Sequence, residues 1–119
     1  MQYMLLIYDD PTSSPAPDSP EAQAEFGEYG AFSQSVQDNG QFVSGAPLQA
    51  TDTATTVRVN GGGEAVLSDG PFAETKEWLA GYYLLDCPDL AAAVAAAARI
   101  PAARHGAIEV RPVMEIPGM

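Results

Sequence analysis

The sequence predicts a single α+β domain that spans residues 1–119. Segments rich in β-branched and aromatic residues alternate with two segments of helical periodicity, which is typical of a mixed fold. A chain of 119 residues is long enough for one hydrophobic core and too short for two. Apolar residues make up 46 % of the chain, more than a disordered protein carries.

The first part of the chain predicts a strand, a loop and a helix. Residues 2–8 are dominated by β formers. The stretch from Asp9 to Pro20 is rich in Pro, Ser and Asp, and we expect an exposed connection there. A helix is expected from Ser19, a capping residue followed by proline, to the stop at Asn39-Gly40. Its buried stripe is predicted at helical spacing: Ala22, Phe26, Tyr29, Ser33 and Val36.

The rest of the chain predicts mainly strands. A strand that begins at Phe42 is expected to break at Gly45-Ala46-Pro47. Residues 53–60 and 64–68 are expected to pair as a hairpin around three consecutive glycines. The remaining elements are a strand at 78–86, an alanine-rich helix at 88–99 and a last strand at 107–116. With the hairpin treated as an insertion, this order predicts a ferredoxin-like sheet with two helices on one face.

Apolar side chains occupy both faces of the strands at 2–8 and 78–86. In the second of these, Leu79, Tyr83 and Leu85 are expected to oppose Ala80, Tyr82 and Leu84. Two helices cover only one face of such a sheet, so we expect the same face of a second subunit to cover the other. The prediction is a homodimer with a cleft between two sheets; the alternative is that loops cover the second face.

The last predicted strand carries charge on one face only. Ile108 and Val110 share one face, while Glu109 and Arg111 share the other. If the apolar side meets the helices, Glu109, Arg111 and the hairpin residue Arg58 point toward the side that the partner covers. The alternative is that these are solvated side chains near strand edges.

Charge and composition exclude several classes of function. The chain has 16 acidic and 5 basic residues, and residues 1–57 contain no Lys or Arg. A surface this acidic argues against binding to nucleic acid or to an anionic membrane. The single cysteine, Cys87, excludes an internal disulfide and a cysteine metal cluster, and we expect it to be a small buried residue.

No signal peptide or membrane span is predicted, so we expect a cytoplasmic protein. The sequence contains no phosphate-binding loop, dinucleotide fingerprint or zinc-protease helix, and we expect no cofactor and no metal. A carboxylate site for a hard cation stays open as an alternative.

The segment Asp69-Gly70-Pro71-Phe72-Ala73-Glu74-Thr75-Lys76-Glu77 places a large aromatic residue and several charges directly after a turn. It resembles the signature of the DGPF (DGPFAETKE) family, part of the YCII-related group, at all nine positions. The opening segment Tyr3–Tyr8, the segment Ser44–Leu48 and the closing segment Ile108–Val113 are also similar to that family. The resemblance covers nearly the whole chain.

The resemblance implies a ferredoxin-like fold that pairs into a dimeric α/β barrel. Relatives in the wider group include small enzymes that act on organic substrates, among them dehydrochlorination of aromatic compounds, with a His-Asp pair whose histidine lies near the first helix. This chain has no histidine there; its single histidine is His105. Family members are also often encoded beside extracytoplasmic-function sigma factors, which implies a regulatory or accessory role.

The candidate catalytic residues are Asp69 and His105. Asp69 is either a general base and ligand acceptor or a turn former that bonds its own backbone. We interpret His105 as a solvent-exposed loop residue, because catalysis would require a carboxylate beside it and the sequence predicts none. The candidate ligand-binding residues are Asp69, Phe72, Arg111, Tyr8 and Tyr83.

Three functions follow as hypotheses. The first is a small-molecule binding protein or enzyme, in which Arg111 holds an anionic substrate and Asp69 moves a proton. The second is a partner of a sigma factor, whose basic surface would meet the acidic first half of the chain. The third is a dimerising scaffold without a ligand.

Overall fold

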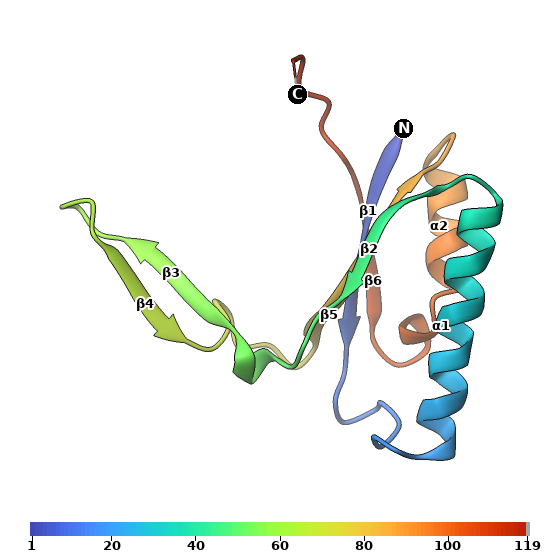
Figure 1. The fold of residues 1–119 in the computed structure, drawn as a ribbon, viewed down its shortest axis with the longest axis horizontal. Helices are drawn as coiled ribbons and strands as arrows, with labels where there is room; N and C mark the ends of the chain where they lie inside the picture. The colour runs from blue at the N-terminus through green and yellow to red at the C-terminus, as the bar shows by residue number, and fades with distance from the viewer. Residues whose placement is uncertain (119) are drawn as a thin grey trace.

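A computed structural model of the chain describes residues 1–118. Four strands form one antiparallel sheet in the order β2-β5-β1-β6, and both helices cover the same face of it (Figure 1). The elements of this layer pair are β1 (Gln2–Asp9), α1 (Pro20–Asp38), β2 (Phe42–Pro47), β5 (Trp78–Asp86), α2 (Leu90–Ala98) and β6 (Ala107–Pro112). The order and the directions of the strands fit a ferredoxin-like α+β fold, as predicted.

The core lies between the sheet and the helices. Alternate residues of the central strands point into it: Tyr3, Leu5 and Ile7 from β1, and Tyr83 and Leu85 from β5. Helix α2 meets them with Ala93, Ala96 and Ala97, all buried. Because alanine projects only a methyl group, the helix axis lies close to the strands. Cys87 is also buried, as predicted, and burial raises the pKa of its thiol.

Helix α1 begins and ends as its caps predict. Ser19 is the N-cap and accepts a hydrogen bond from the amide of Ala22, and Pro20 occupies the first helical position. The predicted buried stripe is confirmed at Val36, which is buried, and at Tyr29, which packs against the core. It is wrong at Phe26, which is 81 % exposed, and it lacks Phe32, which is buried. Phe32 instead packs edge-on against Tyr83, with ring centroids 5.0 Å apart.

Three strands differ from their predicted forms. β2 runs through the expected break, because Gly45 pairs with Tyr83 in the ladder and its missing side chain leaves room for the tyrosine ring. In β5 the register shifts by one residue, so that Ile7 pairs with Gly81 and Tyr8 with Leu79. This β-bulge at Ala80 moves Leu79 to the opposite face from Tyr83, against the simple alternation. The last strand, β6, also ends earlier than expected, at Pro112.

The predicted hairpin forms a separate two-stranded sheet. It consists of β3 (Thr55–Val59) and β4 (Ala65–Asp69), preceded by a short 3-10 turn at Thr51–Thr53, and it projects away from the main sheet (Figure 1). Its apolar side chains are largely exposed, among them Val57, Val59 and Leu67. The guanidinium of Arg58 lies 5.0 Å from the centre of the Phe72 ring.

The sheet face away from the helices is apolar and partly exposed. It carries Met4, Leu6 and Tyr8 from β1 and Tyr82 and Leu84 from β5. Arg111 pairs with Met4 and Glu109 with Leu6 in the register, so both charges lie on this face and form an ion pair with each other. No helix among residues 1–118 is long and apolar enough to cross a bilayer.

Candidate functional site

A cavity of about 520 Å³ lies between α1 and the strands β1, β2 and β5, on the helix side of the sheet. Its walls are mostly apolar, which is usual for a small-molecule site. The residues that line it are Ile7, Asp9, Phe26, Tyr29, Gly30, Ser33, Gln37, Phe42, Gly45, Ala46, Pro47, Ala80, Gly81, Tyr82 and Tyr83. We call this cavity the α1 cleft.

The periodicity of α1 explains its contribution to the cleft. Phe26, Gly30, Ser33 and Gln37 recur at steps of three and four residues, so they form one stripe on the helix. That stripe lies beside the core stripe of Phe32 and Val36. Gly30 stands in the middle of it, and a side chain built there would meet no atom within 4 Å. The glycine therefore keeps open a space that any larger residue would enter.

Two further glycines form the floor. A Cβ atom on Gly45 would lie 2.9 Å from Cδ1 of Tyr83, and one on Gly81 would lie 2.8 Å from the carbonyl oxygen of Ala46. Both distances are shorter than van der Waals contact, so β2 and β5 can approach in this way only without side chains at these positions.

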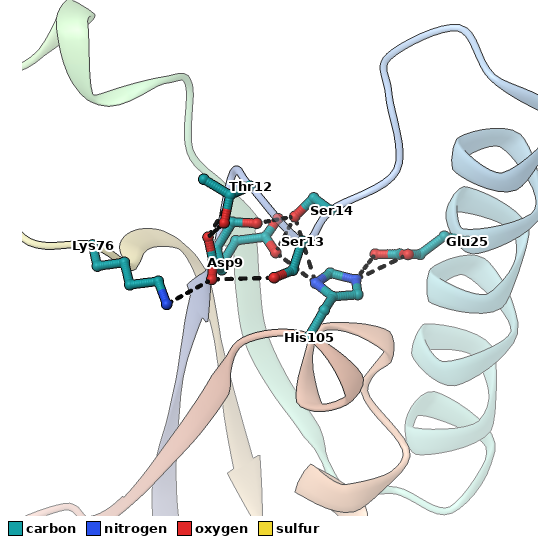
Figure 2. Close-up of polar contacts among 8 residues, drawn as sticks. Asp9, Thr12, Ser13, Ser14, Glu25, Lys76 and His105 are labelled. Atoms are coloured by element: carbon teal, nitrogen blue, oxygen red, sulfur yellow. Dashed lines mark hydrogen bonds and ion pairs between the residues drawn. The ribbon is translucent and has the colours of Figure 1, made fainter.

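At the end of β1, Asp9 lines the cleft and binds the single histidine. Oδ1 of Asp9 lies 3.0 Å from Nδ1 of His105, and the hydroxyl of Ser14 donates to the same oxygen at 2.7 Å. On the other side of the ring, Nε2 of His105 lies 3.0 Å and 3.1 Å from the two carboxylate oxygens of Glu25 (Figure 2). His105 thus connects a carboxylate on β1 with a carboxylate on α1.

The histidine is enclosed by these partners. Its side chain is only 12 % exposed, and that of Glu25 only 15 %. The interpretation of His105 as a solvent-exposed loop residue is therefore wrong. The sequence did not reveal its partners because Asp9 and Glu25 lie 96 and 80 residues away along the chain.

The backbone next to His105 explains why the ring reaches Asp9. The 3-10 turn at Pro101–Arg104 ends at His105, and Gly106 follows. A Cβ atom on Gly106 would lie 2.0 Å from the carbonyl oxygen of Tyr8. Only glycine allows this close approach between the turn and the end of β1. Arg104 also fixes the turn to α1, because its guanidinium donates to both carboxylate oxygens of Glu28, at 2.7 Å and 3.1 Å.

These contacts constrain the protons of the cluster. An ionised carboxylate only accepts hydrogen bonds, and a neutral imidazole donates from one nitrogen alone. Both ring contacts of His105 are hydrogen bonds only when both nitrogens carry a proton or when one of the carboxyl groups does.

Hydroxyl groups supply further polar atoms of the cleft. The hydroxyls of Ser33 and Tyr83 lie 2.8 Å apart, within hydrogen-bond distance. Burial raises the pKa of Tyr29 to about 12, with smaller contributions from the charges of Asp9 and Glu25. Tyr29 is therefore a neutral phenol at ordinary pH and can donate a hydrogen bond.

The loop that follows β1 is held by the buried carboxylate of Asp10. That carboxylate accepts from the amide and the hydroxyl of Thr12 and from the hydroxyl of Ser13. The hydrogen bonds from Thr12 lower the pKa of Asp10. Nζ of Lys76 lies 3.7 Å from Oδ2 of Asp10, so one residue of the signature segment contacts the loop next to the site (Figure 2).

The structure brings together only part of the residues that the sequence singled out. Tyr83 lines the cleft and His105 binds Asp9 beside it. Asp69 ends β4 on the projecting hairpin, and Phe72 follows it, 74 % exposed. Tyr8 and Arg111 lie on the face of the sheet away from the helices. Asp9, Glu25 and Ser33 were missed, and the only local signal was the Asp-Asp pair at the end of the first strand.

The described residues around the α1 cleft form no metal site. Among the described residues, no three His, Cys, Asp or Glu side chains gather in a way that could hold a metal ion. The cluster beside the cleft is instead closed by hydrogen bonds within the protein.

Comparison with known proteins gives the family. The YCII-related domain matches residues 1–117. The chain is also 36 % identical over 115 residues to an uncharacterised protein of Rhizobium meliloti (strain 1021), a match that covers 95 % of this chain and 92 % of that protein. Together with the ferredoxin-like sheet, these matches show that the chain belongs to the YCII-related family.

Proposed function

We propose that the protein binds a small organic molecule in the α1 cleft, with Asp9 as the group that accepts a hydrogen bond or a proton from it. One observation carries the proposal. Among the described residues that line this apolar cleft, Asp9 is the one with an acidic side chain, and His105 holds its carboxyl group in place.

The chemistry available in the cleft is acid–base chemistry. Asp9 is the group that would accept the proton, and the contact at 3.0 Å with His105 holds its carboxyl group in place. Tyr29 and the Ser33–Tyr83 pair supply neutral donors that can bind an oxygen of the ligand. A positioned general base accelerates proton transfer by roughly 10²–10⁴-fold, so this arrangement suffices for a modest enzyme as well as for a binding protein.

The test uses two matched variants of α1. Gly30→Leu places a side chain in the cleft, whereas Gly27→Leu makes the same change at an exposed position of the same helix that does not line it. Both replace a helical glycine by a good helix former, so both should be at least as stable as the parent. Thermal melts are run against phenols, lactones, amines and small organic acids.

A ligand at one hundred times its dissociation constant stabilises a protein by roughly 2.7 kcal/mol. We expect a ligand that raises the melting temperature of the parent and of Gly27→Leu and leaves that of Gly30→Leu unchanged. A ligand that stabilises all three proteins equally would place the binding site elsewhere and would refute the proposal.

We also propose that the protein is a homodimer in which the open faces of two sheets meet. The apolar surface of Met4, Leu6 and Leu84 supports this, since such a surface in water is costly. The exposed hairpin supports it too, because an isolated two-stranded hairpin is marginally stable by itself. A second cleft between the sheets, with Arg111 and Tyr8 at its walls, belongs to this proposal.

A role beside a sigma factor stays a prediction. The feature that favours it is the absence of Lys and Arg from residues 1–57. Co-purification with a neighbouring sigma factor, lost at high salt, is the expected result; free passage of both proteins through a size-exclusion column would oppose it.

A further inference from the structure

The α1 cleft has no Lys or Arg side chain in its lining. The sequence has five Lys and Arg residues, and none of them lines the cleft. Each is engaged elsewhere: Arg58 over Phe72, Lys76 with Asp10, Arg99 over Phe32, Arg104 with Glu28 and Arg111 with Glu109. An anionic ligand would therefore enter the cleft without a Lys or Arg side chain to pair with its charge, and the ring of His105 is already enclosed between Asp9 and Glu25.

Carboxylates stand at the β1 end of the cleft instead. Asp9 lines the cleft, and an oxygen of Glu25 lies 3.0 Å from Nε2 of His105. Two carboxyl groups therefore flank the one imidazole ring. Water screens this cluster only in part, because the side chains of His105 and Glu25 are 12 % and 15 % exposed.

The aromatic walls of the cleft also favour a positively charged ligand. The rings of Phe26, Tyr29 and Phe42 contribute to them, and the faces of aromatic rings attract cations. The aliphatic contribution comes from small residues such as Ala46 and Ala80, which leave room for a flat or cyclic body. An apolar body with one positive group satisfies both the walls and the β1 end.

We infer that the ligand of the α1 cleft is a protonated organic amine with an aromatic or alicyclic body, bound with its ammonium group at Asp9. This inference rests on the proposed small-molecule function and adds the charge of the ligand to it. It replaces the expectation of an anionic substrate on Arg111, whose guanidinium lies on the other face of the sheet and pairs with Glu109.

The experiment compares three probes that share one ring and differ in charge: phenethylamine, phenethyl alcohol and phenylacetate. Binding to the full chain is measured by isothermal titration calorimetry at low and at high salt. We expect the amine to bind roughly tenfold more tightly than the alcohol at low salt, a factor that corresponds to about 1.4 kcal/mol. Phenylacetate should bind most weakly. Added salt should reduce the difference in affinity between the amine and the other two probes.

Two variants locate the effect. Asp9→Asn keeps the size of the side chain and removes its charge, so the amine should lose its advantage over the alcohol. Glu25→Gln should reduce the same advantage and serves as the second variant if Asp9→Asn does not fold. Asp69→Asn removes an equal charge on the hairpin and should leave all three affinities unchanged.

The outcomes separate the two claims. Equal binding of amine and alcohol that Gly30→Leu abolishes would refute the charge preference and leave the cleft as the binding site. Tightest binding of phenylacetate would refute the inference and return Arg111 to consideration. Absence of binding for all three probes at millimolar concentration would contradict the inference and weaken the proposed function as well.

Discussion

At the scale of single residues, the site depends on contacts between parts of the chain that are far apart in sequence. Asp9 ends a strand, Glu25 lies in the second turn of α1, and His105 follows a short 3-10 turn. Each of these positions has an ordinary local explanation, as a strand end, a helix surface or a loop. The three residues form one cluster only because the fold brings β1, α1 and the turn together around the imidazole ring of His105.

Tyr29 gives a titration that reports on the cleft. Its pKa is raised from 10.0 to about 12, so the folded state favours the neutral phenol. This contribution to stability is fully present below about pH 10 and is lost as the pH rises toward 12. Absorbance after a rapid jump to alkaline pH should show a tyrosine that ionises near pH 12, and Tyr29→Phe should remove that transition. Its persistence in the variant would contradict the assignment.

Gly106 should be the glycine that tolerates substitution least. An alanine there would place Cβ 2.0 Å from the carbonyl oxygen of Tyr8, and the backbone beside His105 would have to move. We expect Gly106→Ala to lower the free energy of unfolding by about 1–3 kcal/mol, the usual cost of overpacking. Gly61→Ala, where a Cβ meets nothing within 4 Å, is the control. Urea denaturation of both variants is the measurement, and equal stability of the two would count against the described geometry.

At the scale of elements, α1 carries two functions on adjacent stripes. Phe32 and Val36 anchor the helix on the sheet, while Phe26, Gly30, Ser33 and Gln37 face the cleft. Helical periodicity alone predicts that such stripes exist. It does not decide which one is buried, because Phe26 and Phe32 are equally apolar. Phe32 is the one that is buried, since it packs against Tyr83 of β5.

The β3–β4 hairpin is an addition to the sheet, which should fold without it. β2 and β5 already approach each other where the hairpin leaves, since the amide of Leu48 donates to the carbonyl of Ala80 at 2.8 Å. We expect a chain in which a short glycine-containing turn replaces residues 50–77 to keep the circular dichroism of the parent. The ion pair of Lys76 with Asp10 is lost, while the hydrogen bonds of Asp10 to Thr12 and Ser13 remain. A molten, non-cooperative product would show that the hairpin is part of the core.

At the scale of the whole molecule, neither helix covers one of the two faces of the sheet (Figure 1). Leu84 stands on this face, paired with Met4 on one side and Ser44 on the other. We expect Leu84→Asp to convert a dimer into a monomer of native fold, as measured by light scattering on a size-exclusion column. Leu90→Asp, on the exposed start of α2, is the matched control and should remain dimeric. A parent protein that is already monomeric at micromolar concentration would overturn the dimer.

Much of the fold could be predicted from sequence because its signals are local. Ser19-Pro20 and Asn39-Gly40 define α1, and the β formers between Trp78 and Asp86 define β5 to the residue. The bulge at Ala80 and the continuous β2 could not be predicted, because both result from pairing with neighbouring strands. The site was the least predictable part: the signature segment directed attention to Asp69, while the enclosed histidine found its carboxylates through tertiary packing.

The central claim is that the α1 cleft is the ligand site. Its most direct test is to titrate a mixture of small aromatic amines, alcohols and acids into ¹⁵N-labelled protein and to map the amide shifts. The account predicts that the shifts gather at Gly30, Ser33, Gly45 and Gly81, which line the cleft. Shifts confined to the hairpin around Asp69 and Phe72, or no shifts at all, would contradict it.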